Sequence, residues 1–110
     1  MDIGWVQKIC FSFPEVTESP HFHKTSYRVK KKIFATLDTE KLELVVKLSV
    51  VNQSVFTDML SDNVYPVPGG WGSKGWTIVQ FTNLKKDVLS DILKTAYIEV
   101  APERLSNLLD

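Results

Sequence analysis

The residues that first suggest chemistry form a glycine-rich loop around a lysine, Gly69-Gly70-Trp71-Gly72-Ser73-Lys74-Gly75. A phosphate-binding P-loop needs a glycine directly before the lysine, a Ser or Thr directly after it, and a helix beyond. Here Ser73 precedes Lys74, Gly75 follows it, and residues 76–81 have the composition of a strand. We therefore do not expect a nucleotide site, and the glycines are predicted to let the chain turn between two strands.

A second chemical feature is the basic segment between Ser19 and Leu37, which contains no acidic residue. Its positive side chains are Lys24, Arg28, Lys30, Lys31 and Lys32. Cations at a hairpin tip can follow the phosphates of a duplex, and Lys74 with the rings of Trp71 and Trp76 would add a charge and a stacking surface. These six cations are the predicted nucleic-acid-binding residues, with double-stranded DNA as the partner. The alternative is that the lysines protect an exposed strand edge from pairing with other chains.

Catalytic and metal-binding patterns are missing from the sequence. His21 and His23 alternate, but zinc sites usually take three or four protein ligands and no further ligand is suitably spaced. Cys10 lies on the apolar side of an expected helix and is predicted to be a small buried hydrophobe. No Ser or Cys is paired with a positioned His. We predict a protein that is not an enzyme and has no catalytic residues, no metal and no cofactor.

Length and composition predict a single domain spanning residues 1–110, with a hydrophobic fraction of 44% that is enough for a core. Lys and Arg number 13, as do Asp and Glu, which argues against a dedicated nucleic-acid binder but allows a local basic face. The single cysteine excludes an internal disulfide, and neither a signal-peptide pattern nor an apolar run of membrane-helix length is present. A soluble, cytoplasmic protein without membrane contact is expected.

The hydrophobic pattern of the first half predicts the elements that position these side chains. A helix over about residues 2–12, capped by Asp2, is followed by a polar segment, extended or looped, up to residue 23. Three strands then form a meander over 26–30, 32–37 and 42–48. In the third strand Leu42, Leu44, Val46 and Leu48 alternate with polar or outward residues, which indicates one buried face.

The second half predicts a helix capped by Asn52, a short edge strand over 64–68, and a strand over 75–81. A long helix capped by Asn83 and a short helix opened by Pro102 complete the chain. The predicted fold is therefore α+β: a two-layer sandwich of order α-β(3)-α-β(2)-α, with a five-stranded antiparallel sheet and the helices on one face.

Several short motifs support this prediction through a resemblance. They are Lys32-Ile33-Phe34-Ala35, Leu44-x-x-Lys47-Leu48, Lys74-x-Trp76-x-x-Val79 and Ala96-Tyr97. In this order and spacing, they resemble the MmcQ/YjbR-like family of small bacterial proteins over about residues 13–109. The resemblance implies the same element order, similar to the architecture of type III secretion chaperones. It also implies a DNA-binding label that comes from likeness to a double-wing motif, and it brings no catalytic residues.

A protein partner is the alternative to DNA. Trp71 and Trp76 belong to the residue types that anchor protein interfaces, and they lie in or near loops. They are the predicted interaction residues, for a protein partner or a homodimer formed through the exposed sheet face. Otherwise these rings simply cover that face. The sequence thus predicts a binding protein and leaves its partner open between DNA and protein.

Overall fold

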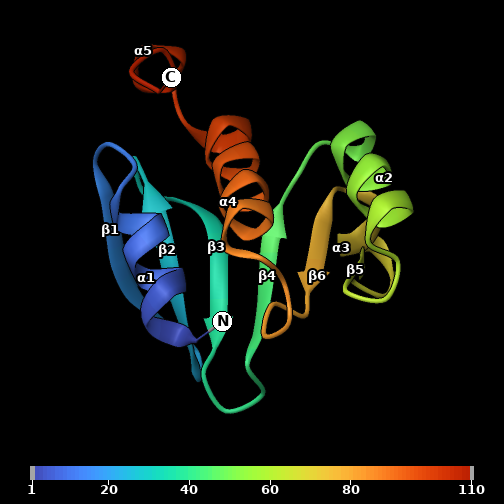
Figure 1. The fold of residues 1–110 in the computed structure, drawn as a ribbon. Helices are drawn as coiled ribbons and strands as arrows, with labels where there is room; N and C mark the ends of the chain where they lie inside the picture. The colour runs from blue at the N-terminus through green and yellow to red at the C-terminus, as the bar shows by residue number, and fades with distance from the viewer. Residues whose placement is uncertain (1, 110) are drawn as a thin grey trace.

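A six-stranded antiparallel sheet forms the centre of the computed structural model, which describes residues 2–109 (Figure 1). The strands follow the spatial order β1-β2-β3-β4-β6-β5. Their bounds are β1 Val16–His21, β2 Lys24–Val29, β3 Lys32–Asp38, β4 Glu43–Lys47, β5 Val64–Pro66 and β6 Trp76–Val79. Short turns join β1 to β4 as successive hairpins, which is why these neighbours are antiparallel.

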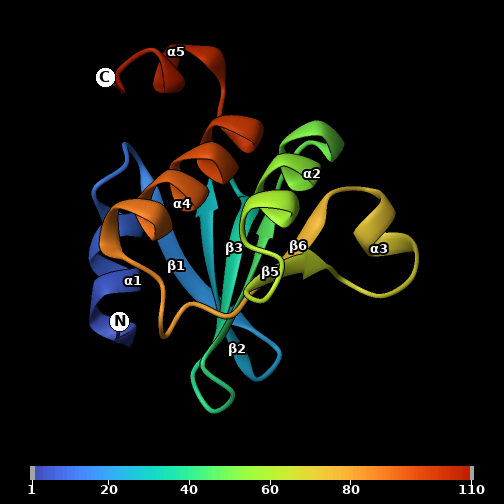
Figure 2. The same cartoon turned by 45° about the vertical axis from the view of Figure 1, so that its right-hand side comes forward.

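Three of the helices, α1, α2 and α4, pack on one face of this sheet. The helix bounds are α1 Ile3–Phe11, α2 Val50–Met59, α3 Gly70–Ser73, α4 Lys86–Val100 and α5 Glu103–Ser106. Figure 2 shows α2 and α4 over the same face and α3 projecting from the β5–β6 end of the sheet. The predicted α+β sandwich with helices on one face is confirmed, with six strands in place of five.

The core lies between this face and the helices. In α4, the apolar stripe predicted from the sequence buries Leu89, Ile92, Leu93 and Ala96 completely. Tyr97, on the same stripe, packs its ring 5.0 Å from Phe13 and 5.6 Å from Phe34, and its hydroxyl donates to the carbonyl of Pro14 at 2.7 Å. Cys10 is fully buried in α1, as predicted, and burial raises the pKa of its thiol.

The additional strand is β1, where the sequence predicts a polar segment that is extended or looped. Its residues Thr17, Glu18 and Ser19 are polar and show no apolar alternation because β1 is an edge strand, bonded only to β2. Pro20 is tolerated there, since a proline that cannot donate to a ladder fits an edge strand. The five-strand prediction was wrong because an edge strand buries too little to leave a hydrophobic pattern.

Three local predictions were also wrong. The N-cap of α2 is Ser49, whose hydroxyl accepts from the Asn52 amide at 3.0 Å, so the helix begins before the predicted cap. Asn83 does not cap α4, since the N-cap position is Lys85 and lacks a side-chain bond. Leu42 precedes β4 and is exposed with φ 54°, so it belongs to the turn and not to the buried face.

Candidate binding groove on the open sheet face

The sheet face opposite the helices carries a groove of about 410 Å³. Its walls and floor come from all parts of the sheet: His21, Lys24, Ile33, Thr36, Val45, Val67, Trp71 and Trp76. Most of these side chains are apolar, and the two tryptophans come from different elements, α3 and β6. We call this feature the groove. Its floor is mainly apolar, and its lining also includes the imidazole of His21 on β1 and the ammonium group of Lys24 on β2.

A β-bulge between β2 and β3 determines which side chains of β3 face the groove. Tyr27 pairs with Ala35 and Arg28 pairs with Ile33, so Phe34 is one extra residue in β3. Such a bulge lets two successive side chains face the same side. Phe34 and Ala35 are both buried in the core, and Ile33 is therefore turned toward the groove.

The loop that carries Trp71 depends on two glycines. A Cβ added at Gly72 would overlap the carbonyl oxygen of Val67, and one at Gly75 would overlap the carbonyl oxygen of Leu48. Gly75 also has φ 104°, which side chains other than glycine rarely adopt. The predicted turning role of these glycines is thus supported, and the loop lies in close contact with β4 and the end of β5.

Two side chains from other elements hold this loop. Gln53, 6% exposed on α2, donates through its amide to the carbonyl of Gly72 at 2.9 Å and to the hydroxyl of Thr77 at 3.1 Å. The Lys47 ammonium donates to the carbonyl of Lys74 at 2.7 Å. Neither residue was singled out as functional from the sequence, because both act on a segment at least 19 residues away.

The charges around the groove are mostly positive. Lys24 is in the lining, and Arg28 lies on the same sheet face, where its Nε donates to Ser26 Oγ at 3.0 Å. Two acids, Asp38 and Glu43, stand opposite each other on the same sheet face and accept hydrogen bonds there. Backbone N–H groups of Lys41 and Glu40, together with His23, hold the pKa of the Asp38 carboxyl below its ordinary value. Glu43 accepts from the Gln80 amide at 2.8 Å.

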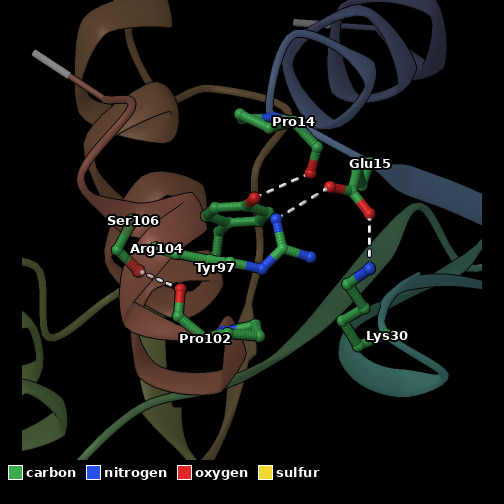
Figure 3. Close-up of polar contacts among 7 residues, drawn as sticks. All are labelled: Pro14, Glu15, Lys30, Tyr97, Pro102, Arg104 and Ser106. Atoms are coloured by element: carbon green, nitrogen blue, oxygen red, sulfur yellow. Dashed lines mark hydrogen bonds and ion pairs between the residues drawn. The ribbon is translucent and has the colours of Figure 1, made fainter.

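The tip of the β2–β3 hairpin forms a separate basic feature, shown with its neighbours in Figure 3. Lys30 and Lys31 make the turn with φ 51° and 69°, the left-handed pair of a tight hairpin. The Lys30 ammonium lies 2.6 Å from a Glu15 oxygen, and the Arg104 guanidinium of α5 lies 3.4 Å from the other. Hydrogen bonding to Lys30 and the nearby charges lower the pKa of Glu15. The positive charge of the tip is thus partly neutralised by the Glu15 carboxylate.

The six cations predicted to bind nucleic acid fall into separate groups. Lys24 lines the groove, whereas Lys30, Lys31 and Lys32 lie at the other end of β2, roughly 20 Å away at strand spacing. Lys74 lies beside Trp71, its Nζ 5.6 Å from the ring centroid. Lys74 lies just before β6, and β6 lies three strand spacings from β2, which carries Lys24. The two strands are therefore roughly 14 Å apart. By contrast, the two predicted interaction residues, Trp71 and Trp76, do come together.

Within residues 2–109, no three His, Cys, Asp or Glu side chains gather as metal ligands. Over the same residues, no helix is long and apolar enough to cross a membrane.

The fold and the groove define an α+β domain with an uncovered sheet face. The YjbR family model matches residues 11–98, and the chain therefore belongs to the YjbR family, as its motifs indicated. A crystal structure of protein DR2400 of Deinococcus radiodurans, which contains a DUF419 domain, has a TM-score of 0.76 at 17% identity. The match covers 89% of this chain and 77% of that one, and at this identity it shows the fold alone. No curated protein matches significantly.

Proposed function

We propose that this protein is a non-enzymatic binding protein whose groove holds a short segment of a protein partner. The observation that carries the proposal is the position of Trp71 and Trp76, which come from different elements and line one groove on an uncovered sheet face. Tryptophans that meet in a concave site are typical anchors of binding energy. A groove of about 410 Å³ accommodates one or two large side chains, not a folded surface.

The charge of the groove favours a particular kind of segment. Lys24 and His21 lie in the same lining as the apolar floor, and Arg28 adds a cation on the same sheet face. The preferred partner is therefore a segment in which an aromatic or aliphatic side chain stands beside a carboxylate. The apolar side chain would pack against Trp71 and Trp76, and the carboxylate would pair with Lys24.

A displayed library of random peptides, selected on the whole protein, tests this proposal. We expect acidic peptides with an aromatic or aliphatic residue, and we expect Trp71→Ala and Lys24→Glu each to weaken their binding at least tenfold in fluorescence anisotropy. Leu108→Ala and Lys41→Glu are matched controls, because both side chains are exposed and lie outside the groove. Selected peptides that bind Trp71→Ala as tightly as the wild type would overturn the proposal, as would a selection that returns no binder.

Double-stranded DNA at the hairpin tip is a second candidate, supported by one observation. Among residues 2–109, neither Lys31 nor Lys32 forms an ion pair, and both are exposed. Lys30 is a poorer target for mutation, since it pairs with Glu15. The tip offers few free cations, which predicts weak binding that is highly sensitive to salt.

A titration of a 20-base-pair duplex at about 50 mM salt tests this candidate. Lys31→Glu combined with Lys32→Glu should abolish binding and leave the melting temperature unchanged. Lys41→Glu combined with Lys85→Glu carries the same charge change on exposed residues outside the tip and should retain most of the binding. Absence of salt-sensitive binding by the wild type, or unaltered binding by the tip variant, would exclude the candidate.

A further inference from the structure

The outer face of α2 carries an exposed apolar stripe formed by Val51, Val55 and Met59. These side chains are 73%, 48% and 68% exposed, and their spacing of four residues places them in one row along the helix. Val50 is also exposed, at 58%, but it lies about 100° around the helix from Val51 and so stands beside the row. We call Val51, Val55 and Met59 the α2 stripe.

The stripe has no role in packing α2 on its own domain. α2 faces the protein through the buried amide of Gln53 and through Phe56, which packs on the core. Val55 follows Gln53 by two residues and therefore points about 200° away around the helix. A solvent-facing helix surface usually carries charged side chains, but the only charged residue in α2 is Asp58.

The outer face of α4 provides a contrast within the same layer. Its exposed positions include Asp87, Asp91 and Glu99 beside a single exposed apolar side chain, Ile98. Both helices lie on the same face of the sheet (Figure 2). The lack of charge on α2 is thus particular to this helix and does not reflect the helix layer as a whole.

We propose that the α2 stripe is covered by the α2 stripe of a second copy of this chain, in an antiparallel helix pair around a two-fold axis. With the axis at Val55, Val51 of each copy packs on Met59 of the other. The stripe is its own complement, as a two-fold contact between identical surfaces requires. The two Asp58 carboxylates lie about 9 Å apart along the helix axes, so the pairing brings no like charges into contact.

The absence of other charges on α2 is the reason for choosing a second copy over an unrelated partner. A foreign partner is usually oriented by complementary charges around the apolar contact, and α2 offers none besides Asp58. The surface that these three side chains and Val50 could bury is smaller than that of a stable interface, which is about 800 Å² on each partner. We therefore expect a reversible dimer with a dissociation constant of tens of micromolar, roughly −6 kcal/mol.

This contact leaves the groove accessible and does not depend on what the groove binds. The groove lies on the open sheet face, whereas α2, which carries the exposed stripe, packs on the other face (Figure 2). The self-association inferred here therefore uses a different surface from a homodimer formed through the sheet face.

Analytical ultracentrifugation of the whole protein from about 5 to 500 μM tests the proposal, a range that spans the expected dissociation constant. The weight-average mass of the wild type should rise toward that of a dimer, and Val55→Glu should remain monomeric. Ile98→Glu is the matched control, because Ile98 is 45% exposed on α4 and Val55 is 48% exposed on α2. A wild type that is monomeric throughout, or a Val55→Glu variant that dimerises like the wild type, would overturn the proposal.

A cysteine variant provides a second test in case Val55→Glu fails to fold. At a helix separation of 8–10 Å, two cysteines on the two-fold axis are within reach of a disulfide. Val55→Cys should therefore form a covalent dimer under mild oxidation much faster than Ile98→Cys. The native Cys10 is fully buried and does not interfere. Equal rates of cross-linking for the two variants would contradict the antiparallel pair.

Discussion

The basic β2–β3 hairpin tip and the pair Trp71 and Trp76 are two features that the sequence predicts to be functional, and their surroundings in the structure differ. At the tip, Lys30 is paired with Glu15 at 2.6 Å, and α5 adds Arg104 to the same carboxylate. In the groove, Trp71 and Trp76 stay partly accessible, and the buried Gln53 supports their loop. Lys30 of the tip is thus engaged within the protein, whereas the two tryptophans of the groove remain partly accessible.

The groove depends on the loop that carries Trp71. Of the changes considered, Gly75→Ala should disturb this loop most strongly. Gly75→Ala places a Cβ against the Leu48 carbonyl at φ 104°, and we expect a loss of roughly 2–4 kcal/mol in the free energy of unfolding. Urea denaturation measures the loss. Gly70→Ala is the control, since no atom lies within 4 Å of its added Cβ. Equal stability of the two variants would show that the loop adapts and that the groove is not preformed.

Removing the support from α2 should have the next largest effect. Gln53→Ala removes the buried amide that donates to the Gly72 carbonyl and to the Thr77 hydroxyl. Both groups keep one other partner, since the Gly75 N–H donates to the Gly72 carbonyl at 3.0 Å and the Thr77 hydroxyl donates to the Gly75 carbonyl at 2.9 Å, so the loss should be about 1 kcal/mol. The same variant should weaken peptide binding, because Trp71 loses its fixed position. Ser54→Ala, an exposed neighbour in α2, should change neither property. A Gln53→Ala protein with unchanged stability in urea would remove the distinction between a supported groove and an ordinary surface loop.

The smallest expected effect concerns the tip and depends on pH. The pKa of Glu15 is lowered in the folded protein, so its ionised form stabilises the fold at neutral pH. This contribution is present above the ordinary glutamate pKa of about 4.3 and is lost as the pH falls through the lower folded value. Glu15→Gln should therefore be slightly less stable than the wild type at pH 7, and the gap should close in acid.

Glu15→Gln also tests whether the tip binds DNA. Glu15→Gln releases Lys30 and should raise the low-salt affinity for duplex DNA a few-fold if the tip contacts phosphates. Thermal melting at pH 7 and pH 3 measures the stability gap, with Glu40→Gln, an exposed acid outside the tip, as control. A stability gap that widens in acid would contradict the sign of the pKa shift.

The regular elements could be predicted from the sequence because their signals are local. Asp2 caps α1, accepting the Trp5 amide at 3.0 Å, and the stripe of α4 is buried as its spacing indicated. β1 could not be recognised, because an edge strand of polar residues has no apolar period. The cap of α2 was misplaced because Ser49 and Asn52 are both good capping residues, and only the fold selects between them.

The candidate site was only partly predictable, for a different physical reason. Trp71 and Trp76 were recognised by residue type, and they do lie together. The presence of Lys24 in the same groove could not be predicted, since it depends on strand order and on a bulge that turns Ile33 outward. The six predicted cations looked like one group because five of them are close in sequence, but a strand separates residues at its two ends by its full length.

The indole N–H signals of the three tryptophans test the central claim most directly. Trp71 and Trp76 line the groove, whereas Trp5 lies in α1 beside Lys86, whose Nζ is 3.4 Å from the ring centroid. In a nuclear magnetic resonance titration with a selected acidic peptide, we expect the signals of Trp71 and Trp76 to shift in a saturable manner while that of Trp5 stays fixed. A saturating peptide that shifts Trp5, or that moves neither Trp71 nor Trp76, would contradict binding in the groove.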